Sequence, residues 1–130
     1  MFELVLTSAE RALLEALNAL GVRYLIVGMG AALLEGAPGT TQDLDLWLQP
    51  PALGGEGLDR VDVVLMASGL ESFDSEFTRA RDYDLDGVSV KVLPLERVIA
   101  SKRAAKRPKD TAQIPMLEAA LAARKARKED

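Results

Sequence analysis

The chain has 130 residues, of which 48% are hydrophobic and 28% are charged, a balance typical of one globular domain with a core of modest size. Cysteine and histidine are both absent, which excludes disulfides, thiolate and imidazole metal ligands, and every catalytic dyad or triad that depends on histidine. No apolar run is long enough to span a membrane, and residues 1–10 show no signal-peptide pattern, so we expect a cytoplasmic protein.

The net charge of -4 conceals an acidic body and a basic C-terminal third. Residues 1–90 contain 5 basic and 15 acidic side chains, whereas residues 91–130 contain 11 basic and 5 acidic ones. The simple interpretation is that the basic side chains at 124–128 are solvated and favour the negative end of a helix dipole. The alternative is that they attract a polyanion.

The first third of the chain predicts a helix, a strand and a second, short helix. Thr7 and Glu10 fit a capping box, and the leucine stripe that follows them stops at Gly21, which predicts the first helix. Residues 22–28, "VRYLIVG", are β-branched and aromatic and predict a mostly buried strand. Residues 31–35, "AALLE", predict little more than one helical turn before a glycine and a proline.

The middle of the chain predicts more strands and a hairpin. Residues 43–49, "DLDLWLQ", alternate with period two, and residues 60–66, "RVDVVLM", predict a third strand. The pair Asp86 and Gly87 between alternating segments indicates a two-residue hairpin turn. Residues 71–81, "ESFDSEFTRAR", have no clear stripe and receive no assignment.

The last third predicts basic helices, at about 94–128. One helix begins near residue 94 and must end near Pro108, and a final helix runs from about Pro115 to Lys128. Asp110 is expected to be an N-terminal cap. Helical spacing also predicts two basic rows on the first of these helices, formed by Lys102 with Lys106 and by Arg103 with Arg107.

Two aspartates one residue apart are the most informative feature of the sequence. Asp43 and Asp45 would point to the same face of a strand, where two carboxylates repel each other unless a hard divalent cation such as Mg²⁺ lies between them. Ordinary surface charge is the open alternative. Trp47 shares this face and is expected to be a core or rim aromatic rather than a base-stacking one.

The upstream glycines favour the cation. A strand that ends at Gly28, with Gly30 opening a helix, would present free backbone N–H groups where a phosphate can bind. A Rossmann turn is excluded because Leu33 occupies the third glycine position and Gly36 stops the helix too early for a crossover.

Residues 24–110 resemble the nucleotidyltransferase superfamily of the DNA polymerase β fold, in particular its small, minimal and antitoxin-like members. The resemblance begins with the apolar-Gly pattern at 27–29 and the Asp-apolar-Asp pattern at 43–45. It continues with Asp62 inside an apolar strand and with "LPLERVIASKRAAKRPKD" at 93–110. It implies one α/β (α+β) domain over residues 1–130, with a small mixed β-sheet and helices on one face.

The resemblance also implies site residues and a cofactor. The catalytic and metal-binding set is Asp43, Asp45 and Asp62. The nucleotide-binding set is Gly28, Met29, Gly30, Thr41 and Lys102. The expected cofactor is Mg²⁺ or Mn²⁺. The expected reaction moves a nucleoside monophosphate from an NTP, with ATP as the expected donor, to a hydroxyl of a protein, RNA or small molecule.

A binding module is the alternative. A catalytically degenerate member of the superfamily would act as the antitoxin-like partner of a second protein, as in a toxin–antitoxin pair, through the basic C-terminal region. Three departures from the pattern favour it: Met29 at the usual second Gly or Ser, Gly39 at a frequent Arg, and the short 49–60 connection. RNA binding by the same basic helices is a third, weaker hypothesis. None of these functions involves a membrane.

Overall fold

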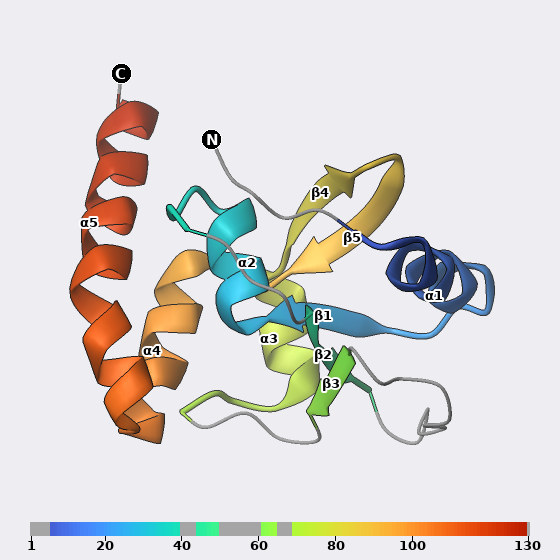
Figure 1. Cartoon of the computed structure of the whole chain (residues 1–130), viewed down its shortest axis with the longest axis horizontal. Helices are drawn as coiled ribbons and strands as arrows, with labels where there is room; N and C mark the ends of the chain where they lie inside the picture. The colour runs from blue at the N-terminus through green and yellow to red at the C-terminus, as the bar shows by residue number, and fades with distance from the viewer. Residues whose placement is uncertain (1–5, 40–43, 50–60, 65–68, 130) are drawn as a thin grey trace.

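The structure, a computed structural model, describes residues 6–39, 44–49, 61–64 and 69–129, with the backbone alone at 61–64 and 128–129. These residues form five helices and five strands (Figure 1). In chain order the elements are α1 (Ser8–Ala19), β1 (Tyr24–Val27), α2 (Gly28–Leu34), β2 (Leu44–Leu48), β3 (Val61–Val64), α3 (Phe73–Arg79), β4 (Arg81–Leu85), β5 (Val88–Val92), α4 (Leu95–Ala105) and α5 (Pro108–Glu129). No described helix has both the length and the apolar character that a membrane span requires.

The strands form one mixed sheet in the order β3-β2-β1-β5-β4. The central strand β1 runs antiparallel to β2 and parallel to β5, where Ile26 pairs with Val92. The outer pairs are β2 with β3, which is parallel, and β4 with β5, which is antiparallel. The predicted α+β class with a mixed sheet is therefore confirmed.

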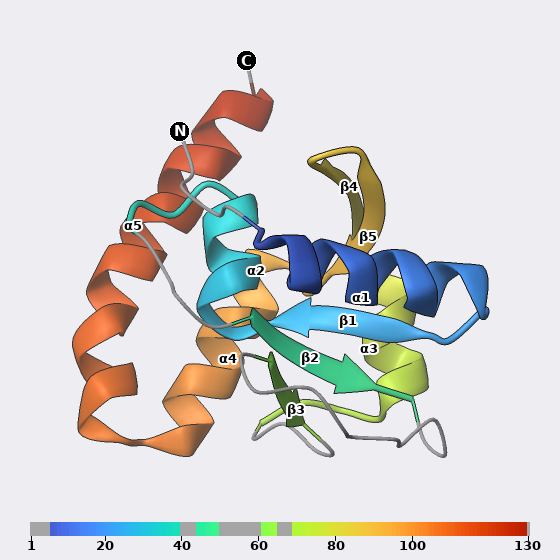
Figure 2. The same ribbon diagram turned by 45° about the vertical axis from the view of Figure 1, so that its right-hand side comes forward.

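Helices lie on both faces of the sheet, so the prediction of helices on one face is wrong. On one face, the Tyr24 hydroxyl of β1 donates to Asn18 of α1 at 3.1 Å. The neighbouring position, Leu25, pairs with Trp47, whose ring packs edge-on against Phe73 of α3. Because successive strand residues point to opposite faces, α1 and α3 cover opposite sides of the sheet, as Figure 2 shows. All four residues of β1 are apolar and buried, which requires cover on both sides.

Helix α3 forms from the segment that the sequence pattern left unassigned. Its seven residues are too few to show an amphipathic stripe. The helix begins with a cap, because the Ser72 side chain accepts a hydrogen bond from the Ser75 N–H at 3.2 Å. Phe73 and Phe77, one turn apart, stack with ring centroids 5.4 Å apart. The Ser72 cap starts the helix, and the contact of Phe73 with Trp47 of β2 holds it against the sheet.

The structure confirms two local predictions, the capping box of α1 and the turn of the β4–β5 hairpin. The Thr7 hydroxyl accepts from the Glu10 N–H at 3.1 Å, and the Glu10 carboxylate accepts from the Thr7 N–H at 2.8 Å, which completes the capping box. In the β4–β5 hairpin, Asp86 and Gly87 have φ values of 54° and 85°, the left-handed pair that a type I′ turn requires.

The C-terminal helices differ from the expected boundaries. Helix α4 ends at Ala105 because Lys106 adopts a left-handed conformation, with φ 58°, so the predicted basic rows do not continue along one helix. Helix α5 begins at Pro108 rather than at Pro115, which lies inside it. Proline suits the first position of a helix, because the N–H that it lacks would have no partner within the helix there. Pro108 is therefore the first residue of α5. Figure 1 shows α4 and α5 side by side at one end of the molecule.

Candidate functional site

The candidate site lies where β1 passes into α2, beside β2. Val27, the last residue of β1, pairs with Asp45 of β2, and Gly28 follows it. Gly28 has φ 64°, and a Cβ atom added there would lie 2.4 Å from Oδ2 of Asp45. A larger residue at position 28 would therefore be strained in the backbone and would also overlap the Asp45 carboxylate. The glycine makes room for this carboxylate.

The backbone register brings a second predicted site residue to the same place. In the parallel β2–β3 pair, the Cα partner of Asp45 is Asp62. Asp45 and Asp62, two members of the predicted metal-binding set, therefore occupy adjacent strands. Asp43, Thr41 and the carboxyl group of Asp62 lie outside the described residues, so the roles of these three residues in metal and nucleotide binding stay predictions.

The other nucleotide-binding candidates of this turn differ in their surroundings. Gly30 is buried within α2, and Met29 is partly buried and packs against the hydrophobic core. Trp47, two residues beyond Asp45, is 3% exposed and packs against Phe73 with a centroid distance of 5.4 Å and an interplanar angle of 88°. The interpretation of Trp47 as a core aromatic is confirmed.

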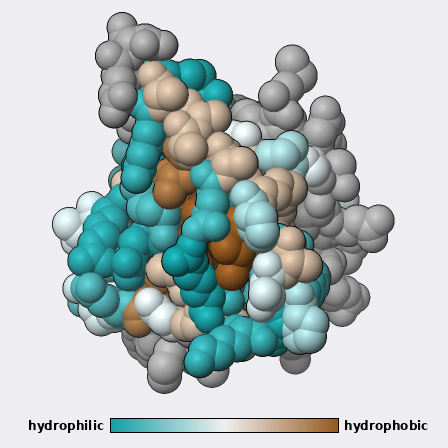
Figure 3. All heavy atoms as spheres, turned by 90° about the vertical axis from the view of Figure 1, so that its left-hand side faces the viewer, coloured by the Kyte–Doolittle hydropathy of each residue, from teal (hydrophilic) through white to brown (hydrophobic). Residues whose placement is uncertain are grey.

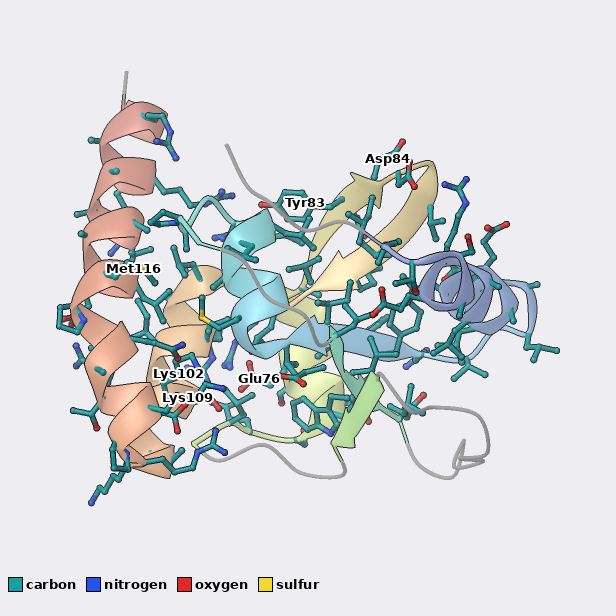
Figure 4. All side chains as sticks on the ribbon, in the orientation of Figure 1. Glu76, Tyr83, Asp84, Lys102, Lys109 and Met116 are labelled. Carbon is teal, nitrogen blue, oxygen red and sulfur yellow. The ribbon has the colours of Figure 1, made fainter. Side chains whose placement is uncertain are left out.

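Lys102, a predicted nucleotide-binding residue, is buried and forms an ion pair inside the fold. Its ammonium group lies 3.2 Å from Oδ1 of Asp110, and the lysine is 8% exposed. Figure 4 labels Lys102 on α4, the helix that packs against α5. Asp110, 1% exposed, is the third residue of α5 rather than its cap, and it also accepts hydrogen bonds from Arg107 at 2.5 and 3.3 Å. The expected cap role of Asp110 is wrong because α5 begins at Pro108, two residues before it. The carboxylate of Asp110 is instead bonded to Lys102 and Arg107.

This ion-pair cluster, Lys102, Arg107 and Asp110, is electrostatically connected with Asp45. The hydrogen bond from Arg107 holds the pKa of Asp110 below its usual value against the opposing effect of burial, and Lys102 lowers the pKa further. The hydrogen bond to Asp110 in turn raises the pKa of Arg107, and the charge of Asp45 adds to this increase. The charge of Asp45 therefore contributes to the electrostatic environment of Arg107.

Sequence reasoning missed two buried glutamates that join elements of the fold. Glu35, next after α2, accepts from the Leu95 N–H at 2.9 Å and contacts the guanidinium of Arg124 at 3.3 Å. Arg81 and the Tyr83 hydroxyl of β4 also donate to it. This carboxylate therefore connects α2, β4, α4 and α5.

The second missed glutamate is Glu76 of α3, which is fully buried. Arg97 of α4 donates to it at 2.6 and 3.0 Å, and the Glu71 N–H donates at 2.8 Å. Burial would raise the pKa of Glu76, but the bonds from Arg97 and Glu71 lower it below its usual value. No pattern in the sequence separates these glutamates from solvated ones, because their partners are distant along the chain.

The fold and the candidate site define an α+β domain with an acidic strand position beside a glycine turn and a basic cluster. Among the described side chains, no three acidic residues are grouped closely enough to hold a metal ion, and the carboxylates of Asp43 and Asp62 are outside that finding. No protein-family model matches the chain, and a comparison with curated proteins gives no match either.

Proposed function

We propose that this protein is a Mg²⁺-dependent nucleotidyltransferase with the polymerase β-like arrangement. The observation that carries the proposal is the position of the Asp45 carboxylate against Gly28, with Asp62 in register on the next strand. A glycine at this position lets the backbone of the β1–α2 turn approach the strand carboxylate closely. The resemblance of residues 24–110 to the superfamily supports the same function.

The proposed metal site consists of Asp43, Asp45 and Asp62. Carboxylate oxygens are the ligands that Mg²⁺ and Mn²⁺ prefer, and Mg²⁺ sites usually combine one or two carboxylates with substrate phosphates. A bound ion would neutralise charge on the triphosphate. The backbone of Gly28, Met29 and Gly30, together with Thr41 just before the aspartates, would bind the phosphates.

The proposed reaction is an in-line displacement at the α-phosphorus of the NTP. The acceptor hydroxyl oxygen forms a bond to the α-phosphorus, the bond to the bridging oxygen breaks, and pyrophosphate leaves with that electron pair. Asp62 would take the proton of the acceptor hydroxyl. The acceptor is a hydroxyl of a protein, RNA or small molecule.

A catalytically degenerate binding module is the second candidate function. The observation that favours it is the exposure of the basic side chains Lys109, Lys125 and Arg127 along α5. Figure 3 shows that hydrophilic side chains predominate on the face that α4 and α5 present, with apolar side chains visible between them. An acidic surface of a protein partner would fit this face.

Thermal melts with metal and nucleotide separate the two functions. Wild type with millimolar Mg²⁺ or Mn²⁺ plus ATP should melt at a higher temperature than the apo protein, because a ligand of the native state stabilises it. Asp45→Asn should abolish this shift, whereas Asp82→Asn, an exposed strand substitution on β4, should retain it. A wild type without any shift would contradict nucleotide binding and favour the binding module. Transfer of label from α-labelled ATP to an acceptor tests the chemical step.

A further inference from the structure

Helix α1 carries apolar residues on its outer side as well as on the side that packs on the sheet. Its buried residues are Glu10 and Leu14. On the outer side, Ala9, Ala16 and Leu20 are exposed, and Leu20, which caps the C-terminus of the helix, is 77% exposed. A surface helix normally carries charged and polar residues on the side that faces water. The outer side of α1 therefore has the composition of a contact surface.

The apolar outer residues form a regular row along the helix. We call Ala9, Leu13, Ala16 and Leu20 the α1 seam. Their spacings of four, three and four residues place the four side chains on one helix face, in the repeat that two packed helices use. Leu13 is partly buried and also packs against the core, which fixes one edge of the seam to the body of the protein.

The α1 seam carries no charge. Arg11 and Glu15 are bonded to each other at 3.0 Å, and Arg11 also contacts the Asp86 carboxylate of the β4–β5 hairpin at 3.0 Å. A helix that lies on a lipid surface combines its apolar face with a basic one, whereas Arg11 is the one cation of α1. The seam therefore favours an apolar protein surface over a membrane.

The alternation of small and large residues along the seam indicates which protein surface fits it. In an antiparallel pair of α1 helices related by a two-fold axis, Ala9 of each copy lies opposite Leu20 of the other. In the same pair, Leu13 lies opposite Ala16. Each leucine then meets an alanine, and such alternation of large and small side chains lets two helices interdigitate closely. A parallel pair would instead match leucine with leucine and alanine with alanine.

We infer that two copies of this chain associate through their α1 seams in an antiparallel, two-fold symmetric pair. Figure 1 shows α1 at the end of the molecule opposite α5, where a second copy can approach it. No residue of the α1 seam belongs to the candidate site, so the pairing does not depend on the proposed function.

The length of α1 sets the strength of the pair. The helix has 12 residues and is about 18 Å long. Two such helices bury less than the roughly 800 Å² per partner of a standard interface. The pair should therefore be weak, with a dissociation constant of about 10 to 100 µM.

Sedimentation equilibrium from about 5 µM to about 1 mM chain measures the pairing. Wild type should change from monomer to dimer over this range. Leu20→Glu should weaken the dimer at least about tenfold, because pairing would bury a carboxylate without a partner. Ala119→Glu, which changes an exposed alanine of α5, is the matched control and should dimerise like wild type.

An exchange of the two end residues tests the antiparallel arrangement. Ala9→Leu places a leucine opposite Leu20 of the second copy and should weaken the dimer, because the seam becomes overpacked there. The double variant Ala9→Leu with Leu20→Ala restores a leucine–alanine pair at the same place. It should therefore recover the wild-type dissociation constant within about threefold.

Three results would overturn the inference. They are a wild type that stays monomeric over the whole concentration range, a Leu20→Glu variant that dimerises like wild type, and a double variant that dimerises no better than Ala9→Leu. Monomeric wild type that binds vesicles of phosphatidylcholine and phosphatidylserine, while Leu20→Glu does not, would assign the seam to a lipid surface instead. Because Ala9 and Leu20 are exposed, unchanged melting temperatures in dilute solution serve as the folding control.

Discussion

The buried glutamates and the strand aspartate Asp45 show two ways in which this fold treats an acidic side chain. Glu35 and Glu76 are enclosed by arginines and backbone N–H groups from several elements. Asp45 is partly exposed at the end of the β1–β2 pair, and the residue beside its carboxylate is a glycine with positive φ. The fold surrounds the glutamates with hydrogen bonds from distant elements, whereas beside Asp45 a glycine gives room to the carboxylate itself. Substitutions should therefore affect stability at the first two positions and ligand binding at the third.

The largest effect should follow from Glu35→Gln. This change leaves the guanidinium groups of Arg81 and Arg124 without their buried counter-charge, which should lower the free energy of unfolding by about 3 to 5 kcal/mol. Urea denaturation measures the loss. Glu15→Gln, which removes only an exposed helix pair with Arg11, should change it by less than about 0.5 kcal/mol. A loss below about 1 kcal/mol at Glu35 would contradict a fold-maintaining role.

A pH-dependent effect should follow from Glu76→Gln. The folded-state pKa of Glu76 lies below its usual value, so its ionised form stabilises the protein above the unfolded-state pKa, and this contribution is lost as the pH falls through the folded-state pKa. At neutral pH the variant should be about 2 to 4 kcal/mol less stable than wild type. The difference should shrink as the pH falls from about 5 to 3. A difference that stays constant over this range would contradict ionisation of Glu76 in the native protein.

Gly28→Ala should cost about 2 kcal/mol, because it combines a left-handed backbone with overlap against the Asp45 carboxylate. Gly21→Ala is the matched control: its φ of 72° is similar, but nothing lies within 4 Å of the added Cβ, so it should cost about 1 kcal/mol. In an Asp45→Gly background, Gly28→Ala should cost no more than the control. If Gly28→Ala costs as much in the Asp45→Gly background as in wild type, overlap with the Asp45 carboxylate is not the reason that position 28 requires glycine.

The smallest stability effect should come from Asp45→Asn. The proposed site would bring Asp45 close to other carboxylates that repel it, while its charge also favours the guanidinium of Arg107. Because these effects oppose each other, removing the charge should change the free energy of unfolding of the apo protein by less than about 1 kcal/mol. The same change should abolish stabilisation by Mg²⁺ with ATP, as thermal melts with and without ligand will show. A clear loss of apo stability would instead group Asp45 with Glu35 and Glu76 as a residue that the fold requires.

The sequence predicted those features that neighbouring residues determine. The Thr7–Glu10 capping box and the Asp86–Gly87 turn depend on residues within one turn of each other, and both are confirmed. Strand alternation likewise identified the stretch that contains Asp45. Cover of the second sheet face by α3 could not be predicted, because a helix of seven residues has too weak a periodicity and is stabilised by contacts with distant strands.

The sequence predicted the acidic strand positions of the candidate site but not the ion pairs between its helices. The Asp-apolar-Asp pattern indicated Asp45, and the β2–β3 register supports Asp62 beside it. The ion pair of Lys102 was not predicted, because helical spacing places this lysine with other cations but says nothing about a carboxylate contributed by the next helix. The ion pair of Lys102 with Asp110 forms because α5 packs against α4. The spacing of residues within one helix cannot predict such a contact between two helices.

The order of strands in the sheet affects how the chain can be assembled. On one edge β1 pairs with β2, which follows it closely, and on the other edge with β5, which comes much later in the chain. The chain between β1 and β5 is long, and the entropy cost of bringing its two ends together must be overcome before β1 can pair with β5. During synthesis, a nascent chain that has not yet reached β5 presents an apolar strand with one open edge. Such an edge is prone to pair with other chains, so the late arrival of β5 makes this stage the one at which a chaperone gives most protection.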